Sequence, residues 1–525
     1  MQLPPKDMCK INIEHVFAEG KFYNRKIYKK FIMDTDWTFG LSNQDPVITK
    51  HEGTGNQPAT KFKTKQEKRN GIKMSRDITS AFTEANKYVD LIKKNDADIT
   101  RQEREAVAKE TVANFRNHVN KGFLEYRKSV TEEGSFAVTE WTGQGSILKD
   151  ILGREYIDLL GGFGLYSYGI RHPKIVEAVK AQLDRSPQYS QEMLDPLRAK
   201  LAQVLGMLTP GEIQYGFFAN SGTEAVEGAM KLAKLYTGNK GFIAMLKGFH
   251  GKTLGSLSLM GKNVFRQPLL PLLEGVQHAP FGDADEVERL LKTSKQVGNG
   301  IAAIVAEPIQ GEAGAIVPPD DFWPRLRELC DHYGVLLIAD EVQTGFGRTG
   351  KLFGVDHWNV TPDIMCFGKA LGGGVVPLSG FFSTHDIWEV MEPNPFMHTT
   401  TTGGNPLACA SALAAITVLQ EEGLVEQAAQ KGEYVMKRLN ELKEAYPGIL
   451  NNVTGRGLLI GMEFVSDEVG YHLAAGLFSR GVITSGTLSN AKCIRFEPAL
   501  NIPMETLDRA LAVMEEVFQE IKDSN

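Results

Sequence analysis

The stretch Ile364-Met365-Cys366-Phe367-Gly368-Lys369-Ala370-Leu371-Gly372-Gly373-Gly374 joins a short apolar run to a single lysine and three glycines. Four consecutive apolar residues predict a buried strand. The glycines predict a turn directly after it, with little side-chain bulk around the lysine amine. A lysine at a strand end is usually a solvated charge, but its amine can also condense with an aldehyde. The role of Lys369 therefore depends on its neighbours in the fold.

Similar apolar runs recur between about residues 196 and 420, and helical patterns such as residues 223–236 separate them. The runs that we expect to be buried strands are Tyr215–Ala219, 242–246, Ile301–Ala306, 335–339 and Ile364–Phe367. Strands that alternate with helices predict an α/β fold with a mostly parallel sheet covered on both faces. Ligands bind such sheets at the carboxyl ends of the strands, which is where Lys369 lies.

The chain is expected to divide into an N-terminal segment (74–195), a large domain (196–425) and a smaller α/β domain (426–525). The N-terminal segment has a capping-box sequence, Thr100-Arg101-Gln102-Glu103, and a hairpin-like pattern over residues 140–160. The last hundred residues predict strands at 458–464 and Cys493–Phe496 and a closing helix from Met504 to about Lys522.

Residues 1–73 show no persistent helical or alternating pattern, and we expect them to be mostly disordered. One interpretation is an interaction arm. The other, which we favour, is that translation begins at Met74 and that Lys68-Arg69-Asn70-Gly71 translates a purine-rich ribosome-binding site. The underlying DNA would distinguish the two.

Composition narrows the class of protein. The net charge of -6 over 525 residues indicates neither a nucleic-acid partner nor a membrane surface. No apolar stretch approaches the length of a membrane span, and no secretory signal is evident. Five scattered cysteines suit a reducing compartment, so we expect a cytoplasmic protein. The cysteines are Cys9, Cys330, Cys366, Cys409 and Cys493.

Two polar clusters follow other predicted strands. Asn220-Ser221-Gly222-Thr223-Glu224 opens a helix, so it is either a phosphate-binding helix N-terminus or an ordinary helix cap. Asp340-Glu341-Val342-Gln343 follows a central strand, where a carboxylate is costly unless it is paired. Asp340 could hold the ring nitrogen of a pyridine cofactor, with Gln343 donating to the ring hydroxyl. The alternative is a solvated strand-end pair, but Lys369 on a later strand favours the cofactor.

Two further segments could complete a cofactor site. Phe249 in Phe249-His250-Gly251-Lys252 could stack on an aromatic ring, although a single Phe is more often a core residue. The hydroxyl-rich run His398-Thr399-Thr400-Thr401-Thr402 could donate to a phosphate or form a turn-rich loop. The histidines have no metal-ligand spacing, so no metal site is predicted.

In combination, these segments resemble the class III PLP-dependent aminotransferases from about Ile78 to the C-terminus. The matching motifs, in order, are Ser-Gly-Thr-Glu, Phe-His-Gly, Glu-Pro-Ile-Gln-Gly-Glu, Asp-Glu-Val-Gln-Thr-Gly, Gly-Lys-Ala-Leu-Gly-Gly-Gly and Gly-Gly-Asn-Pro. The resemblance implies the PLP fold type I, pyridoxal 5'-phosphate (PLP) as cofactor, and an obligatory homodimer. Residues 122–130, 190–192 followed by 194–198, and 486–492 are most similar to the bacterial putrescine-type members.

The resemblance also implies roles for single residues. Lys369 would anchor PLP covalently, Asp340 would pair with the ring nitrogen and Gln343 would contact the ring hydroxyl. Phe249 would stack on the ring, and the phosphate would be held by two groups. These groups are Gly222 and Thr223 of one subunit and Thr401 of the neighbouring subunit.

One position departs from the ornithine and acetylornithine members, which carry an arginine after this glycine to hold the substrate's α-carboxylate. Lys252 stands there in this chain, and lysine cannot form the same bidentate fork. A donor without an α-carboxylate, such as putrescine or cadaverine, is therefore expected, with 2-oxoglutarate as acceptor. Gln191 and Glu312 are candidates for the distal ammonium, and Arg495 is expected to pair with Glu312 and to bind the acceptor's carboxylate. The alternatives are a relative acting on ornithine, acetylornithine or 4-aminobutyrate, and a non-catalytic homologue, which should lack Lys369 or Asp340.

Overall fold

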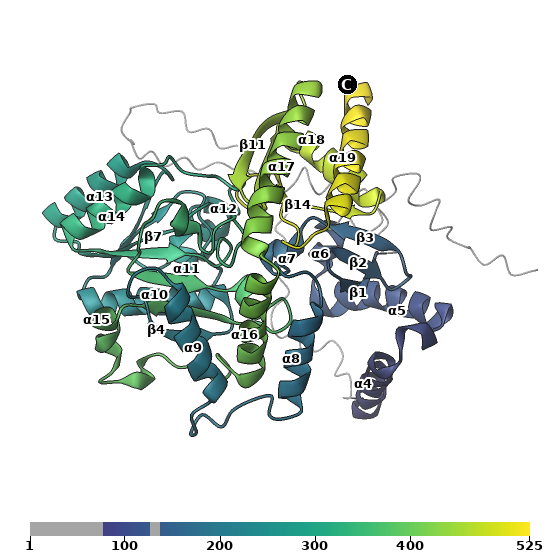
Figure 1. Ribbon diagram of the computed structural model, residues 1–525, viewed down its shortest axis with the longest axis horizontal. Coiled ribbons are helices and arrows are strands. Elements are labelled where there is room, and N and C mark those ends of the chain that lie inside the picture. Colours follow the sequence, from purple (N-terminus) through teal and green to yellow (C-terminus); the bar gives the residue numbers. More distant parts are fainter. Residues whose placement is uncertain (1–76, 127–136, 525) are drawn as a thin grey trace, which may run out of the picture.

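The computed structural model describes residues 77–126 and 137–524, with the side chains of 125 and 126 left aside. Both interpretations of residues 1–73 lie outside this part of the chain. Figure 1 shows a large α/β layer of helices and strands on the left and a smaller C-terminal part at the upper right, with the N-terminal strands below the latter. No single helix in the described ranges is long and apolar enough to cross a membrane. The helices Pro406–Glu421 and Leu424–Ala445, which meet at 62°, pass that test only as a bent pair.

A seven-stranded sheet forms the centre of the large domain, in the order β4-β10-β9-β8-β7-β5-β6. Only β10 runs antiparallel to its neighbours. The strands are β4 (Tyr215–Ala219), β5 (Gly241–Met245), β6 (Val276–Ala279), β7 (Ile301–Ala306), β8 (Leu336–Asp340), β9 (Ile364–Phe367) and β10 (Ser379–Ser383). The five predicted strands are therefore confirmed to within one residue. β6 and β10 were not predicted, because Val276–Ala279 is half polar and Ser379–Ser383 begins with serine and glycine.

Both faces of this sheet are buried, since successive side chains of a strand point in opposite directions. Ile338 of β8 packs in a cluster with residues of α10 (Gly222–Thr237), including Val226 and Ala229. Its neighbour Leu337 packs in the main cluster, which includes Trp323 of α14 (Phe322–Tyr333). Helices on both faces leave the carboxyl ends of the parallel strands as the open edge.

The remaining helices connect and cover these strands. Those around the large sheet are α8 (Pro173–Leu183), α9 (Pro196–Leu208), α11 (Leu254–Leu259), α12 (Asn263–Arg266), α13 (Ala284–Gln296), α15 (His385–Trp388) and α16 (Pro406–Glu421).

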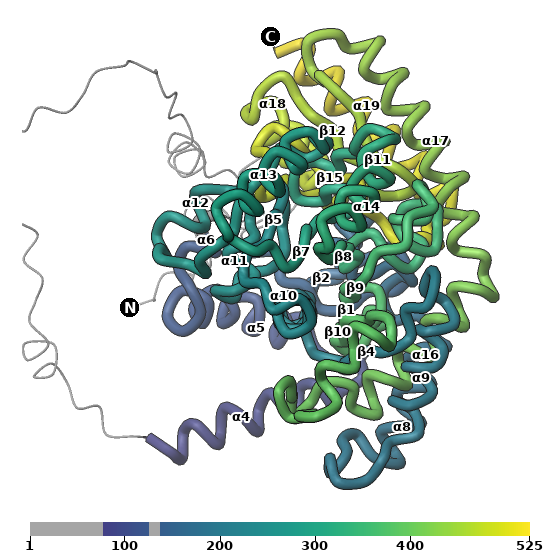
Figure 2. The backbone as a smooth tube through the Cα atoms, turned by 90° about the vertical axis from the view of Figure 1, so that its left-hand side faces the viewer, coloured from purple at the N-terminus to yellow at the C-terminus, as the bar shows by residue number. Residues whose placement is uncertain are grey.

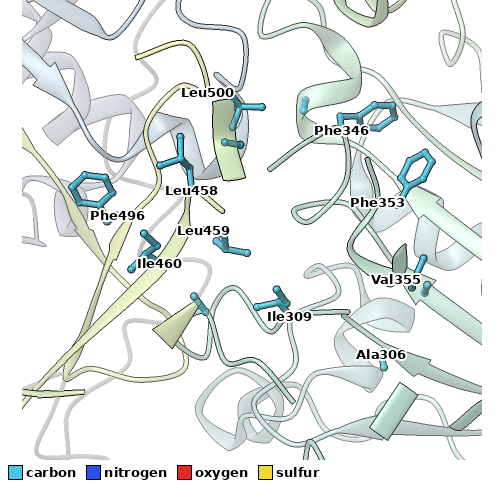
Figure 3. Packing of buried hydrophobic residues seen from close by; sticks show 14 of the residues in the cluster. Ala306, Ile309, Phe346, Phe353, Val355, Leu458, Leu459, Ile460, Phe496 and Leu500 are labelled. Atoms are coloured by element: carbon cyan, nitrogen blue, oxygen red, sulfur yellow. The ribbon is translucent and has the colours of Figure 1, made fainter. Parts of the chain in front are cut away.

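The C-terminal part forms a second sheet, in the order β11-β12-β15-β14. Its elements are α17 (Leu424–Ala445), β11 (Leu450–Arg456), β12 (Leu459–Phe464), α18 (Asp467–Ser479), β13 (Val482–Ile483), β14 (Ser485–Gly486), β15 (Cys493–Phe496) and α19 (Met504–Ser524). Figure 3 shows how this part packs on the large domain. Ile460 and Phe496 lie on one side of the shared hydrophobic cluster, and Ile309 and Phe353 lie on the other.

The N-terminal strands β1 (Glu140–Gln144), β2 (Ile147–Asp150) and β3 (Glu155–Asp158) form the predicted antiparallel hairpin pattern. β3 also pairs in parallel with β13, so the N-terminal segment and the small domain share a sheet. The helices before the hairpin are α4 (Ile78–Lys93), α5 (Arg101–Asn114) and α6 (Lys121–Tyr126), and α7 (Gly161–Gly164) follows it. The predicted capping box at Thr100 is present, and α4 projects from the body (Figure 2).

Candidate active site

Lys369 follows β9 through Gly368 and has a left-handed backbone conformation, with φ of 43°. This conformation is strained for a lysine, and such strain is found most often at functional sites. The side chain is half-buried. Burial lowers the pKa of the Lys369 amine below its usual value, although the carboxylates of Glu497 and Glu312 oppose this effect. A larger share of neutral amine makes Lys369 a better nucleophile and base at neutral pH.

Asp340 is the last residue of β8 and pairs with Cys366, the residue before the last one of β9, which is the strand that leads to Lys369. It is 4% exposed, and its Oδ2 lies 2.8 Å from Nδ1 of His250. Its Oδ1 accepts the backbone N–H of Val342 at 3.2 Å. Burial opposes protonation of His250, but the hydrogen bond and charge of Asp340 raise its pKa overall. The carboxylate is therefore fixed in place at the open edge of the sheet.

The N-terminus of α10 lies against the same region. The first N–H groups of a helix have no partner within it, and they favour an anion. The Thr223 hydroxyl is shared with Thr253 at 2.7 Å and Ser256 at 2.5 Å, which ties this helix end to α11. A Cβ atom on Gly251 would lie 2.3 Å from the Thr223 hydroxyl, so only glycine fits beside this helix end.

These groups surround one cavity of about 180 Å³. It is lined by Gly222, Thr223, Phe249, His250, Gly251, Glu307, Asp340, Val342, Gln343, Thr344 and Lys369. Six residues that the sequence singled out for one cofactor therefore meet at one place, although they come from distant segments of the chain. An amine, a buried carboxylate, an aromatic side chain and a helix N-terminus form the donor set that a phosphorylated pyridine aldehyde requires. The residues fit that group.

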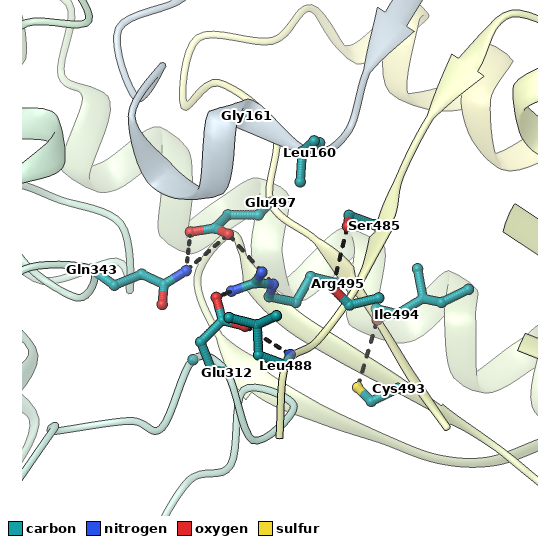
Figure 4. Close-up of polar contacts among 12 residues, drawn as sticks. Leu160, Gly161, Glu312, Gln343, Ser485, Leu488, Cys493, Ile494, Arg495 and Glu497 are labelled. Carbon is teal, nitrogen blue, oxygen red and sulfur yellow. Dashed lines mark hydrogen bonds and ion pairs between the residues drawn. The ribbon is translucent and has the colours of Figure 1, made fainter. Parts of the chain in front are cut away.

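A second polar cluster lies around Arg495 (Figure 4), and its member Gln343 also lines the cavity. The predicted pair between Arg495 and Glu312 is present, with Nη1 2.6 Å from Oε1, and both side chains are buried. Glu497 accepts two hydrogen bonds from Nε2 of Gln343, at 2.9 and 3.0 Å. The Gln343 amide therefore faces Glu497, and its predicted contact with the cofactor's hydroxyl stays a prediction. Nε and Nη2 of Arg495 have no hydrogen-bond partner within the described residues.

Three predicted residues lie away from the cavity wall of this chain. Gln191 donates from Nε2 to the backbone oxygen of Thr401 at 2.8 Å, and both residues are exposed. Their exposure is compatible with the predicted contact of Thr401 with a neighbouring subunit. Lys252 is exposed, and its ammonium lies 4.5 Å from the ring centroid of Phe265 and 5.9 Å from that of Phe249.

Sequence reasoning gave no role to three buried residues, His250, Glu307 and Glu497. Glu307 accepts the backbone N–H of Phe249 at 3.0 Å, and burial raises its pKa to about 7. His250 and Glu307 occur in the motifs quoted above, but nothing in their spacing predicts that they approach Asp340. For Glu497, the local sequence does contain a pattern that could have predicted its position beside Arg495. Residues two apart on a strand share a face, so the sequence Arg495-Phe496-Glu497 places an acid beside a base.

Comparison with known proteins gives a consistent result. The family described as "Aminotransferase class-III" matches residues 129–518. The structure superposes on the ornithine aminotransferase of Toxoplasma gondii with a TM-score of 0.73 at 29% identity, covering 84% of this chain and 98% of that one. An amine transaminase from an uncultivated Pseudomonas species, solved in its PLP-bound form, has a TM-score of 0.69 at 30% identity, with 75% and 97% covered. The acetylornithine aminotransferase of Elizabethkingia anophelis has a TM-score of 0.64 at 34% identity, with 73% and 94% covered.

Proposed function

Because the chain belongs to the class III aminotransferases and is a PLP-dependent enzyme of fold type I, we propose that its amine donor is a diamine. The proposed donor is putrescine, with cadaverine as a second substrate, and the proposed acceptor is 2-oxoglutarate. The products are then glutamate and 4-aminobutanal, which cyclises to 1-pyrroline. The amine is oxidised to an aldehyde as the oxo acid is reduced to an amino acid, so the two half-reactions balance.

PLP supplies the aldehyde that receives the amino group and the electron-withdrawing ring that stabilises charge on the substrate carbon. The chain supplies the rest. Lys369 would hold the cofactor, and its Nζ would move a proton at the substrate's reacting carbon. The fixed carboxylate of Asp340 would pair with a cationic ring nitrogen, and the α10 N-terminus with Gly222 and Thr223 would hold the phosphate.

The presence of lysine at position 252 is the observation that supports a diamine as the donor. Its ammonium lies beside the rings of Phe265 and Phe249, as a cation held on aromatic faces. A lysine in this position gives a point charge and not the planar fork that holds an α-carboxylate. The carboxylates of Glu312 and Glu497 are buried beside Arg495, and a substrate with an ammonium at its far end suits their charge.

The acceptor is supported by Arg495. Its buried guanidinium already binds one carboxylate through Nη1, that of Glu312, and the carboxylate of an acceptor can take the place of Glu312 there. We propose that this arginine binds the distal carboxylate of 2-oxoglutarate. We also propose a homodimer in which the Thr401 loop reaches the phosphate of the neighbouring subunit.

A substrate panel tests the donor. Purified enzyme with PLP and 2-oxoglutarate is incubated with putrescine, cadaverine, ornithine, acetylornithine and 4-aminobutyrate. Glutamate is measured for all of them, and 2-aminobenzaldehyde traps the cyclic imine. The proposal requires the two diamines to have the highest kcat/KM. A higher value for any of the three carboxylate-bearing amines would replace the proposed donor with that amine.

A Lys252→Arg variant is expected to raise the kcat/KM ratio of ornithine to putrescine by about tenfold, because arginine can form the bidentate contact with an α-carboxylate. Steady-state kinetics with both donors measure the ratio. Lys351→Arg is the matched control, since Lys351 is an exposed lysine in a turn outside the cavity. An unchanged ratio in Lys252→Arg would show that this position does not select the donor.

A further inference from the structure

Glu497 is a wholly buried carboxylate that the proposed proton transfer and cofactor binding do not use. It directly follows β15, and its backbone N–H donates to the oxygen of Leu159 at 2.8 Å. Its side chain is also confined on the N-terminal side, since a Cβ atom on Gly164 would lie 2.7 Å from Oε1 of Glu497. The carboxylate is therefore held in one position by the contact between the small domain and the N-terminal segment.

This carboxylate is only partly satisfied. A carboxylate has about four acceptor positions, and the described hydrogen bonds to the side chain of Glu497 come from one donor, Nε2 of Gln343. A buried carboxylate with so few donors is costly, so its position calls for a functional explanation. Gln343 lines the cavity, which places Glu497 directly behind the cavity wall.

Glu497 faces one particular edge of Arg495. The guanidinium uses Nη1 to bind Glu312, whereas Nε and Nη2, which form its other edge, have no hydrogen-bond partner in the described chain. Oε2 of Glu497 lies 3.9 Å from Nε, too far for a hydrogen bond but close enough for a strong charge interaction. Figure 4 shows the two carboxylates on different sides of this guanidinium.

The Nε–Nη2 edge should be the preferred binding position for an incoming carboxylate. Its two nitrogens can donate to both carboxylate oxygens, and Glu312 need not be displaced. The charge of Glu497 opposes that binding. We propose that Glu497 is a specificity-determining positioning residue that closes the Nε–Nη2 edge of Arg495 to carboxylates. A carboxylate then reaches Arg495 only by displacing Glu312.

The net charge of the cluster formed by Glu312, Arg495 and Glu497 follows from this arrangement. One guanidinium lies between two carboxylates, so the three side chains carry a formal charge of −1 (one positive and two negative). This negatively charged cluster favours the far ammonium of a diamine and disfavours the carboxylate of an amino acid. The inference deepens the proposed function and rests on it for the identity of the donor.

The decisive measurement is the affinity for glutarate, a dicarboxylate with the length of 2-oxoglutarate but no reactive oxo group. Isothermal titration of PLP-loaded enzyme gives its Kd without any amine. The Glu497→Gln variant keeps the size and an acceptor for Gln343 but loses the charge. It is expected to bind glutarate about tenfold more tightly, since a like charge beside the Nε–Nη2 edge is removed. It is also expected to lower KM for 2-oxoglutarate and raise KM for putrescine.

Three further variants separate this role from a structural one. Glu497→Asp keeps the charge and is expected to stay within about twofold of the wild-type Kd. Glu341→Gln removes another fully buried carboxylate, which binds Thr344 and two backbone N–H groups, and should leave the Kd unchanged. Gln343→Met frees a charged Glu497 to pair with Nε of Arg495, and it should weaken glutarate binding.

The inference is overturned if Glu497→Gln, folded and loaded with PLP, binds glutarate no more tightly than wild type. It is equally overturned if Glu497→Asp or Gln343→Met tightens binding to the same extent. If Glu497→Gln does not fold, the direction of the Gln343→Met effect decides. Failure of the diamine donor would appear in the substrate panel alone, because the glutarate titration uses no amine.

Discussion

A Lys369→Ala variant is expected to lose at least about 10⁴-fold of the transamination rate, because one side chain both anchors the cofactor and moves the proton. The backbone at this position is already strained, with φ of 43°, and alanine keeps the same Cβ atom. The substitution also removes an amine whose ammonium form is disfavoured by burial. We therefore expect activity to be lost without loss of the fold.

Three measurements separate these effects. Glutamate formation from putrescine and 2-oxoglutarate gives the rate. Borohydride reduction followed by peptide mass spectrometry is expected to mark Lys369 in wild type and to mark no peptide in the variant. Thermal unfolding shows whether the fold persists. Lys351→Ala, at an exposed turn, is the control and should keep full activity. More than about 1% residual activity in Lys369→Ala would contradict the assigned role.

The central sheet could be predicted because its strands carry a strong local signal. Ile301–Ala306 and Ile364–Phe367 are uninterrupted apolar runs, and both are fully buried strands. Ser379–Ser383 is equally buried, but its serines and glycine resemble a turn. Its burial comes from antiparallel pairing with β4 and β9, which is a tertiary effect. The pairing of β3 with β13 joins segments more than 300 residues apart, and no local pattern reports it.

The candidate site also has features that could be predicted from the sequence and features that could not. Asp340, Lys369 and Gly222 could be predicted to meet because each follows a parallel strand or opens the helix after one, and the strand ends share an edge. Side-chain partners across domains could not be predicted from spacing. Gln343 donates to Glu497 across 154 positions, and no spacing in the sequence predicts this contact. The motifs predict which residues line the cavity, and packing decides what each side chain contacts.

An Asp340→Asn variant is expected to lower kcat by about 10³-fold. A neutral amide does not stabilise a cationic ring nitrogen, so the cofactor ring withdraws electron density from the substrate carbon less strongly. The side chain keeps its size, and its Oδ1 can still accept from Val342. The loss should appear mainly in kcat, and PLP should bind more weakly. Steady-state kinetics at saturating PLP and a PLP titration measure the two effects.

His250 gives the same variant a second readout that is independent of turnover. In wild type, Asp340 raises the pKa of His250, so their pairing contributes stability that is fully present below the usual histidine pKa of about 6.5. That stability is lost as the pH rises through the raised pKa. Without the carboxylate, burial disfavours protonated His250, so acid should destabilise the variant. The difference in Tm between wild type and Asp340→Asn, measured without PLP, should therefore be larger at about pH 6 than at about pH 8. A constant difference in Tm across that range would mean that Asp340 does not control the protonation of His250.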